Sequence, residues 1–205
     1  MYSNKEMNDV IYRYTREMEI IKLRLKSIVD ISDKFEYAQS VVEFAALQLR
    51  KIIEQIVLSS LITNYKEYLE YYHKLASVWN IKYIMKDIER INPNYYPVAA
   101  LVGENAKNVF EGAGYATKDD IIDAYEKTSK VLHSQNPFAE RIDYLGMFKY
   151  ILSMYKKVVN LLNEHLMWPY NGDILFIRLH YDSTDSVEVR WYAKTEERYV
   201  EEDKP

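Results

Sequence analysis

The chain has 205 residues with a formal net charge of −4, and this slightly acidic balance argues against a surface coated in positive charge for bulk binding of nucleic acid. Hydrophobic residues make up 48% and charged residues 28% of the chain, which is ordinary for a soluble globular protein and allows one large domain, alone or with a small appendage. Cysteine is absent, which excludes disulfides, thiolate metal sites and a cysteine nucleophile.

Residues 5–30 form the first predicted helix. Its apolar side chains recur at alternating steps of four and three, as in the packing seam of a heptad repeat. The seam consists of Met7, Ile11, Tyr14, Met18, Ile21, Leu25 and Ile28. Such a helix either lies along the next helix of its own chain, which is the more common outcome, or pairs with a copy of itself in a dimer.

The stretch 35–62 predicts a central helix, because it contains neither Pro nor Gly and is longer than an average helix. Apolar residues occupy two of its sides, which indicates a helix that is covered on both. One side holds Ala38, Val42, Ala45, Leu49, Ile52, Ile53 and Ile56, and the other holds Phe44, Leu47 and Leu58. The remaining polar stripe contains Glu43, Arg50 and Glu54.

After a short break, a third helix is predicted from about 66 to 91, and the brief connection makes it antiparallel to the central helix. Asn92 and Pro93 end this helix, since the residue before a proline is disfavoured in the helical conformation. The irregular segment that follows contains 98–111, which is either a short β-hairpin or a loop.

Thr117, followed by Asp120 in the manner of a capping box, predicts the start of a fourth helix that ends near Ser134. A long last helix is then predicted from about 139 to 166. Because the next proline lies at position 169, the helical bundle is expected to occupy residues 1–168.

The hydrophobic period then changes to two, which predicts a β-hairpin within 169–195 and a charged, frayed tail at 196–205. A lone hairpin is marginally stable, so it must lie on the helices, join strands at 98–111, or pair with another chain. The predicted fold is therefore mainly α, an antiparallel bundle of about five helices with a C-terminal β-hairpin.

The most suggestive local sequence is SKVLHSQNPF at 129–138, which puts His133 and Asn136 at a helix end, just before the turn forced by Pro137. The carbonyl groups exposed at a helix C-terminus attract a positively charged side chain, so His133 is a candidate for acid–base chemistry. The structural alternative is that His133 caps the helix and Asn136 fixes the loop.

The polar stripe of the central helix is the second candidate site. One interpretation is an intrahelical ion pair between Arg50 and Glu54. The other is a binding site of Glu43, Arg50 and Glu54, in which Arg50 reaches a phosphate or carboxylate, because a covered charge needs partners. The four histidines lack metal-ligand spacing, and motifs for phosphate loops, zinc proteases and serine hydrolases are absent, so we expect no metal and no cofactor.

The sequences FAALQLRKIIEQIV and LHSQNPF, in this layout of helices, resemble the HEPN superfamily (higher eukaryotes and prokaryotes nucleotide-binding), in particular its poorly characterised bacterial branches. The resemblance covers about 35–166. In catalytic members an Arg, followed four to six residues later by a His, cleaves RNA, usually across a dimer interface. His133 matches the His, whereas positions 127–129 hold Lys127, Thr128 and Ser129, so the Arg is missing. Lys127 can supply positive charge there but not the planar, two-pronged donor that holds a phosphate.

The resemblance implies a homodimeric module that binds a nucleotide, RNA or a protein partner in bacterial stress or phage defence, without nuclease activity. One alternative is a metal-independent RNase in which His133 is the acid–base group and Lys127 or Arg50 stabilises phosphate charge. Another is an assembly protein that acts through the heptad helix and the hairpin. The first ten residues lack the apolar core of a signal peptide and no apolar run could span a membrane, so we expect a cytoplasmic protein.

Overall fold

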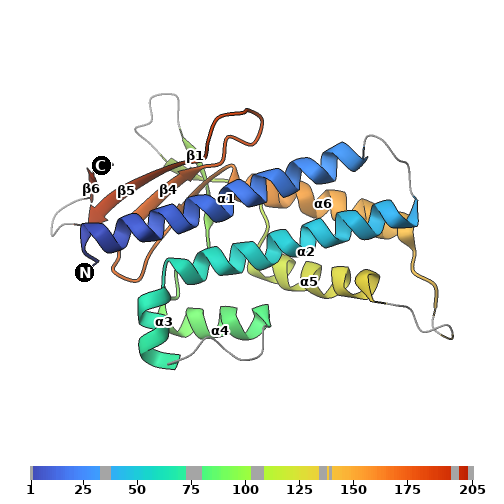
Figure 1. The fold of residues 1–205 in the computed structure, drawn as a ribbon, viewed down its shortest axis with the longest axis horizontal. Coiled ribbons are helices and arrows are strands. Elements are labelled where there is room, and N and C mark those ends of the chain that lie inside the picture. The colour runs from blue at the N-terminus through green and yellow to red at the C-terminus, as the bar shows by residue number, and fades with distance from the viewer. Residues whose placement is uncertain are drawn as a thin grey trace.

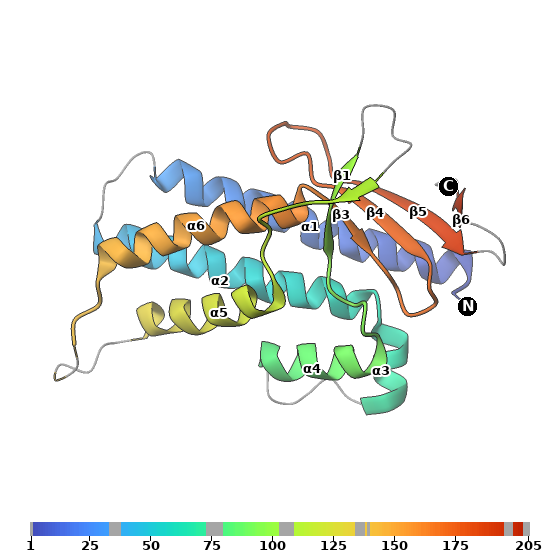
Figure 2. The same ribbon diagram turned by 180° about the vertical axis from the view of Figure 1, so that it is seen from behind.

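The computed structural model describes residues 2–32, 38–72, 80–102, 109–133, 138, 140–194 and 199–202. Within these ranges the chain is mainly helical, with long helices packed side by side and a β-sheet at one end of the bundle (Figures 1 and 2). No helix among the described residues combines the length and the apolar character that crossing a membrane requires.

The helices are α1 (Asn4–Ser32), α2 (Gln39–Ile62), α3 (Tyr65–Tyr72), α4 (Ile81–Ile91), α5 (Lys118–Leu132) and α6 (Tyr144–Leu162). The strands are β1 (Val98–Val102), β2 (Val109–Glu111), β3 (Glu164–Met167), β4 (Ile174–Arg178), β5 (Glu188–Lys194) and β6 (Tyr199–Glu202). They form a single sheet in the order β2-β1-β3-β4-β5-β6, in which every neighbouring pair is antiparallel.

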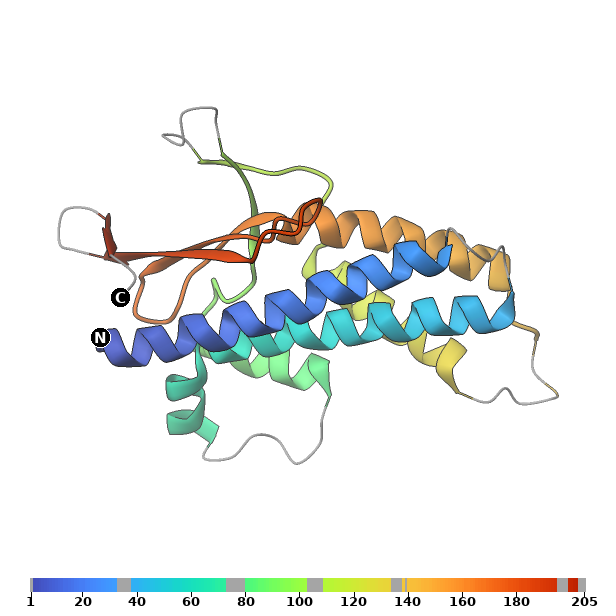
Figure 3. The same cartoon turned by 45° about the horizontal axis from the view of Figure 1, so that its top comes forward.

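α1 buries its predicted seam inside the chain. Six of the seven predicted residues are almost completely buried, whereas Ile11 is only partly buried and its neighbour Val10 takes the inner position. The seam packs along α2, and the N-terminal half of α1 lies under one face of the sheet, as Figure 3 shows. A dimer through this seam is therefore excluded, because a second copy would have to displace α2.

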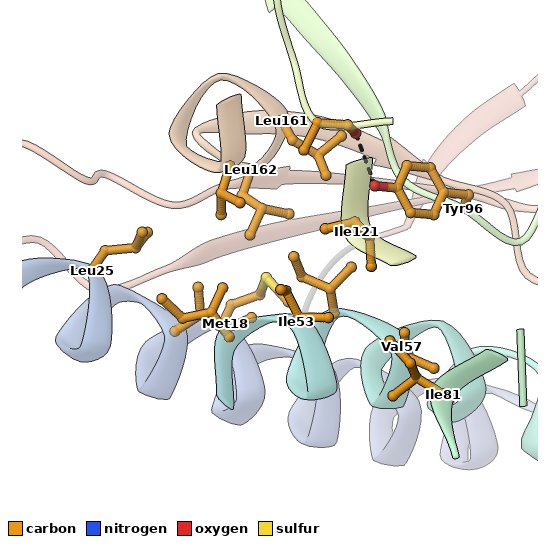
Figure 4. Packing of buried hydrophobic residues seen from close by; sticks show 14 of the residues in the cluster. Met18, Leu25, Ile53, Val57, Ile81, Tyr96, Ile121, Leu161 and Leu162 are labelled. Atoms are coloured by element: carbon orange, nitrogen blue, oxygen red, sulfur yellow. Dashed lines mark hydrogen bonds between the residues drawn. The ribbon is translucent and has the colours of Figure 1, made fainter. Parts of the chain in front are cut away.

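α2 is the central helix of the bundle, and it contacts all five other helices. Figure 4 shows how side chains from several helices meet in one core, with Met18, Ile53 and Ile121 directed toward the same interior. The second side of α2 is less covered than predicted, since Leu47 is 40% exposed. The helix begins at Gln39, and the predicted start at Phe35 lies outside the described residues.

The single helix predicted over 66–91 is wrong, because α3 and α4 are two separate helices. Asn80 has an extended backbone, with φ −135° and ψ 118°, and its side chain accepts a hydrogen bond from the backbone N–H of Lys82. A residue in this conformation begins a new helix and cannot continue an old one. The residues between the two helices, 73–79, are outside the described ranges.

The last predicted helix, 139–166, is too long at both ends. Asp143 caps the N-terminus of α6 by accepting a hydrogen bond from the backbone N–H of Gly146, and α6 ends at Leu162. The following residues, predicted to be helical, form β3 and pair with β1 on one side and β4 on the other. Pairing on both sides satisfies the backbone groups of β3, which overrides the local helical pattern.

β3 joins the two predicted hairpins into one sheet. The hairpin at 98–111 is present as β1 and β2, and the C-terminal hairpin is β4 and β5. The tail was predicted to fray, but its residues 199–202 pair with β5 as β6. Leu175, Ile177, Val189 and Trp191 are buried, as the period-two pattern predicted for the C-terminal hairpin.

β3 also places a histidine in the core. His165 is completely buried, its Nδ1 lies 3.0 Å from the carbonyl oxygen of Leu162, and its Nε2 lies 2.7 Å from the hydroxyl oxygen of Tyr14. Burial lowers the pKa of His165 to about 4 and raises the pKa of the Tyr14 hydroxyl. The neutral imidazole therefore donates to the carbonyl of Leu162 and accepts from Tyr14, which joins α1 to the sheet.

Candidate functional site

A pocket of about 810 Å³ is lined by residues from the N-terminal part of α2, the C-terminal end of α5 and the segment before α6. These three parts of the chain lie at the left end of the bundle in Figure 2. The polar lining of the pocket consists of Gln39, Glu43, His133, Arg141 and Tyr144. Two of the predicted site residues, His133 and Glu43, therefore share one pocket although they are far apart in the sequence.

His133 reaches the pocket because α5 ends there. Its backbone is extended, with φ −96° and ψ 145°, so it is the C-cap of the helix, and its side chain is exposed. The capping box of Thr117 and Asp120 fixes the other end of the same helix, as predicted. Asn136, the second residue predicted in this turn, lies outside the described residues.

Glu43 enters the pocket from the first turns of α2. Its Oε1 accepts a hydrogen bond of 2.8 Å from Nε2 of Gln39, one helical turn earlier, and lies 3.4 Å from the hydroxyl oxygen of Tyr144. These two contacts come from different helices. They hold the carboxylate at the junction of α2 and α6.

Arg141 lines the pocket but was not among the predicted site residues, and the same holds for Gln39 and Tyr144. The HEPN motif places an Arg before the His, whereas Arg141 follows His133 in the sequence. Tyr144 falls within the predicted helix 139–166, and its position in that helix gave no reason to single it out. The available clue was that Arg141 follows Pro137, where the sequence predicts a turn, within a few residues, since a turn brings residues on its two sides together.

Arg50 does not line this pocket but is directed onto α5. Its Nε lies 3.2 Å from Oε1 of Glu54, its guanidinium carbon lies 4.0 Å from the ring centre of Tyr125, and it also donates a hydrogen bond to Ser129. Glu54 also pairs with Lys51, at 2.8 Å. With its side chain 21% exposed, Arg50 connects α2 to α5 one turn before His133.

Lys127 is also outside the pocket, on the side of α5 that faces α6. Its Nζ lies 2.8 Å from Oδ2 of Asp123 and 4.3 Å from the ring centre of Tyr150. The hydrogen bond from Lys127 is the main cause that lowers the pKa of the Asp123 carboxyl, and the hydroxyl of Tyr150 adds a second. The two predicted catalytic residues, Lys127 and His133, are therefore not brought together in one site.

The pocket combines groups of opposite charge with an apolar wall. Arg141 provides positive charge and hydrogen-bond donors, His133 provides its ring nitrogens, and Glu43 provides a negatively charged acceptor. Val131, Leu132 and Ile142 complete the lining. Such a set suits a small ligand that carries an anionic group, a hydrogen-bond donor and an apolar ring. No group of three or more His, Asp or Glu side chains in the described part of the chain could hold a metal ion.

The residues behind the HEPN resemblance have different surroundings, since His133 lines the pocket and Lys127 does not. Comparisons with protein-family models, with curated proteins and with solved structures found no match. The resemblance therefore stays a prediction made from the sequence.

Proposed function

We propose that this chain is a HEPN-like helical module that binds a nucleotide or RNA in the pocket between α2, α5 and α6. The observation that carries the proposal is that His133, Arg141 and Glu43 line one pocket of about 810 Å³. Small-molecule sites commonly have volumes of roughly 300–1,000 Å³ and combine apolar walls with a few polar groups.

The charges of the pocket set the direction in which a nucleotide would lie. A phosphate is attracted to the guanidinium of Arg141, which can donate two parallel hydrogen bonds, and to His133 when its imidazole is protonated. The base, which is planar and largely apolar on its faces, packs against Val131, Leu132 and Ile142. The proposal therefore predicts that affinity depends on the phosphate and on Arg141.

The test is a binding titration of fluorescent ribonucleotides and short single-stranded RNA. We expect Arg141→Gln to weaken binding by at least about tenfold, since a hydrogen bond to a charged group contributes about 1.5–3 kcal/mol. The matched control is Arg13→Gln, a change at an exposed arginine of α1 that lies outside this pocket. Absence of binding, or equal losses for Arg141→Gln and the control, would contradict the proposal.

A metal-independent RNase is the second candidate, and the presence of Arg141 beside His133 in one pocket favours it. His133 would take the proton of the ribose 2′-hydroxyl as the 2′-oxygen attacks phosphorus. The bond from phosphorus to the 5′-oxygen breaks, that oxygen takes a proton from water, and a 2′,3′-cyclic phosphate remains. Arg141 would stabilise the charge that develops on the phosphate oxygens.

The cleavage test compares the unchanged chain with His133→Ala on RNA in the presence of a metal chelator. Equal cleavage by both, or none by either, rules out this second function. The binding proposal would stand in that case, because binding is measured separately.

We also propose that the module acts as a cytoplasmic homodimer in bacterial stress or phage defence, as the HEPN resemblance implies. Leu47 and Leu145, which are 40% and 44% exposed, support an interface with a second copy or a protein partner beside the pocket. Leu47 lies one turn after Glu43, and Leu145 follows Tyr144. Light scattering after size-exclusion chromatography measures the mass, and a monomer at micromolar concentration would contradict the homodimer. Cell fractionation tests the location.

A further inference from the structure

We propose that Glu43 makes the pocket selective for ribonucleotides over deoxyribonucleotides by accepting a hydrogen bond from the ribose 2′-hydroxyl. This inference rests on the proposed function, because it requires a nucleotide in the pocket. Glu43 is thereby a specificity-determining residue.

The first step of the argument is the state of the carboxylate. Both contacts of Glu43 described above, with Gln39 and with Tyr144, fall on Oε1. Oε2 accepts no hydrogen bond from any residue that the structure describes. An ionised carboxylate offers about four acceptor positions and no donor, so a ligand meets at Oε2 an acceptor that is already held in place.

The second step is electrostatic. A carboxylate repels phosphate, so the phosphate lies toward Arg141 and His133, and Glu43 must face a part of the ligand that donates hydrogen bonds. The ribose is bonded directly to the phosphate and carries hydroxyl donors. It therefore fits between the basic side chains and the apolar wall of Val131, Leu132 and Ile142.

The third step separates the sugar from the base. The side chains of the apolar wall neither donate nor accept hydrogen bonds, so they hold a base without distinguishing one base from another. The 2′-hydroxyl is common to all ribonucleotides and is the group by which a protein can tell RNA from DNA. We assign the open Oε2 of Glu43 to the 2′-hydroxyl, because the 3′-hydroxyl is present in both sugars and cannot distinguish them.

The experiment is competition of a fluorescent ribonucleotide by matched pairs of ribo- and deoxyribonucleoside monophosphates with each of several bases. We expect the ribo form to bind roughly 10- to 100-fold more tightly, the range that follows from one hydrogen bond to a charged acceptor. Glu43→Leu should reduce this ratio to about one, and Glu43→Gln, which keeps a neutral acceptor, should leave an intermediate ratio. Arg141→Gln should weaken both forms alike and keep the ratio.

Each outcome has a distinct meaning. Equal binding of ribo and deoxy forms, or a ratio that survives in Glu43→Leu, overturns this inference and leaves the proposed function in place. The inference is also overturned if Glu43 causes a preference for bases with an amino group and the 2′-hydroxyl has no effect. Glu43 would then accept a hydrogen bond from the base and not from the sugar. If no nucleotide binds, the proposed function fails and this inference fails with it.

Discussion

The two ends of α2 carry polar side chains of similar kinds in opposite situations. At the C-terminal end Ser60, Thr63 and Asn64 are almost completely buried. The side chain of Asn64 donates to the carbonyl of Ser60 and accepts from Asn92, at 2.8 Å each. At the N-terminal end Gln39 and Glu43 line the pocket. The difference shows that the fold uses one set of polar groups internally and leaves the other accessible to a ligand.

The pockets beside these two ends differ in the same way. A groove of about 650 Å³ near the C-terminal end, between α1, α2 and α3, is lined mainly by apolar side chains. Its charged residues pair with each other, Glu6 with Lys66 at 3.1 Å and Asp9 with Arg13 at 2.8 Å. In the pocket at the N-terminal end, basic residues and Glu43 come from different elements and face a shared space. The C-terminal end thus serves stability, and four experiments test this division of labour.

Asn92→Ala should have the largest effect on stability. The side chain of Asn92 donates to Oδ1 of Asn64 at 2.8 Å and to the carbonyl of Trp168 at 2.7 Å, and it accepts from the backbone N–H of Asn94. Its loss leaves buried polar groups without a partner, so we expect the free energy of unfolding to fall by roughly 2–4 kcal/mol. Urea unfolding measures this. Gln39→Ala, at the exposed end of α2, is the control and should change the value by less than about 0.5 kcal/mol.

Acid should weaken the fold through His165. In the folded state its pKa is about 4, below the ordinary value of 6.5, so the unfolded chain binds more protons between these two values. The contribution of His165 to the free energy of unfolding is therefore fully present above about pH 6.5. This contribution decreases by about 3 kcal/mol as the pH drops toward 4. Urea unfolding at several pH values measures the slope.

The control for the acid experiment is a pair of variants. His165→Asn keeps a donor near the carbonyl of Leu162 and removes the titration, so its stability should depend less on pH in this range. His133→Asn, at an exposed position, should keep the slope of the unchanged chain. Equal slopes for all three chains would contradict the role of His165.

Arg50→Gln should have an intermediate effect. It removes the ion pair with Glu54 and the contact with the ring of Tyr125, so we expect a loss of about 1–2 kcal/mol in the free energy of unfolding. Arg50→Lys keeps the charge without the planar group and should recover only part of the loss. Nucleotide affinity should stay unchanged in both variants. A tenfold loss of affinity would show that Arg50 belongs to the binding site.

Lys127→Met should have the smallest effect. Its ion pair with Asp123 is partly exposed, and such pairs contribute about 0.2–1 kcal/mol. Because Lys127 lies outside the pocket, nucleotide binding and any RNA cleavage should be the same as in the unchanged chain. A clear loss of either activity without a loss of stability would restore Lys127 as a catalytic candidate.

Periodicity predicted the helices where local sequence and packing agree. The seam of α1 and the buried faces of α2 follow directly from apolar spacing, since both helices are long and their apolar faces pack against neighbouring elements. The spacing continues through Leu166, however, and a helix and the strand β3 are equally compatible with that short apolar run. Only pairing with β1 and β4, which are distant in the sequence, decides between them.

The candidate site was predicted in part. His133 and Glu43 were singled out because a charged group at a helix end or on a covered helix needs a reason to be there, and both line the pocket. Arg50 was chosen by the same logic, and Lys127 because it stands at the position of the missing HEPN Arg, but both contact partners on α5 or α6 outside the pocket. Arg141 could not be found from a motif that places the Arg before the His, because Arg141 follows His133 in the sequence.

The place of β3 in the middle of the sheet has a consequence for synthesis of the chain. β1 pairs with β3, which is made only after α5 and α6, and α1 packs on β5, which is made later still. On the ribosome, the part of α1 that contacts β5, and the edge of β1 that pairs with β3, are therefore covered only after the last third of the chain is made. A chain released after α6 would leave the edge of β1 unpaired, which is a known cause of aggregation.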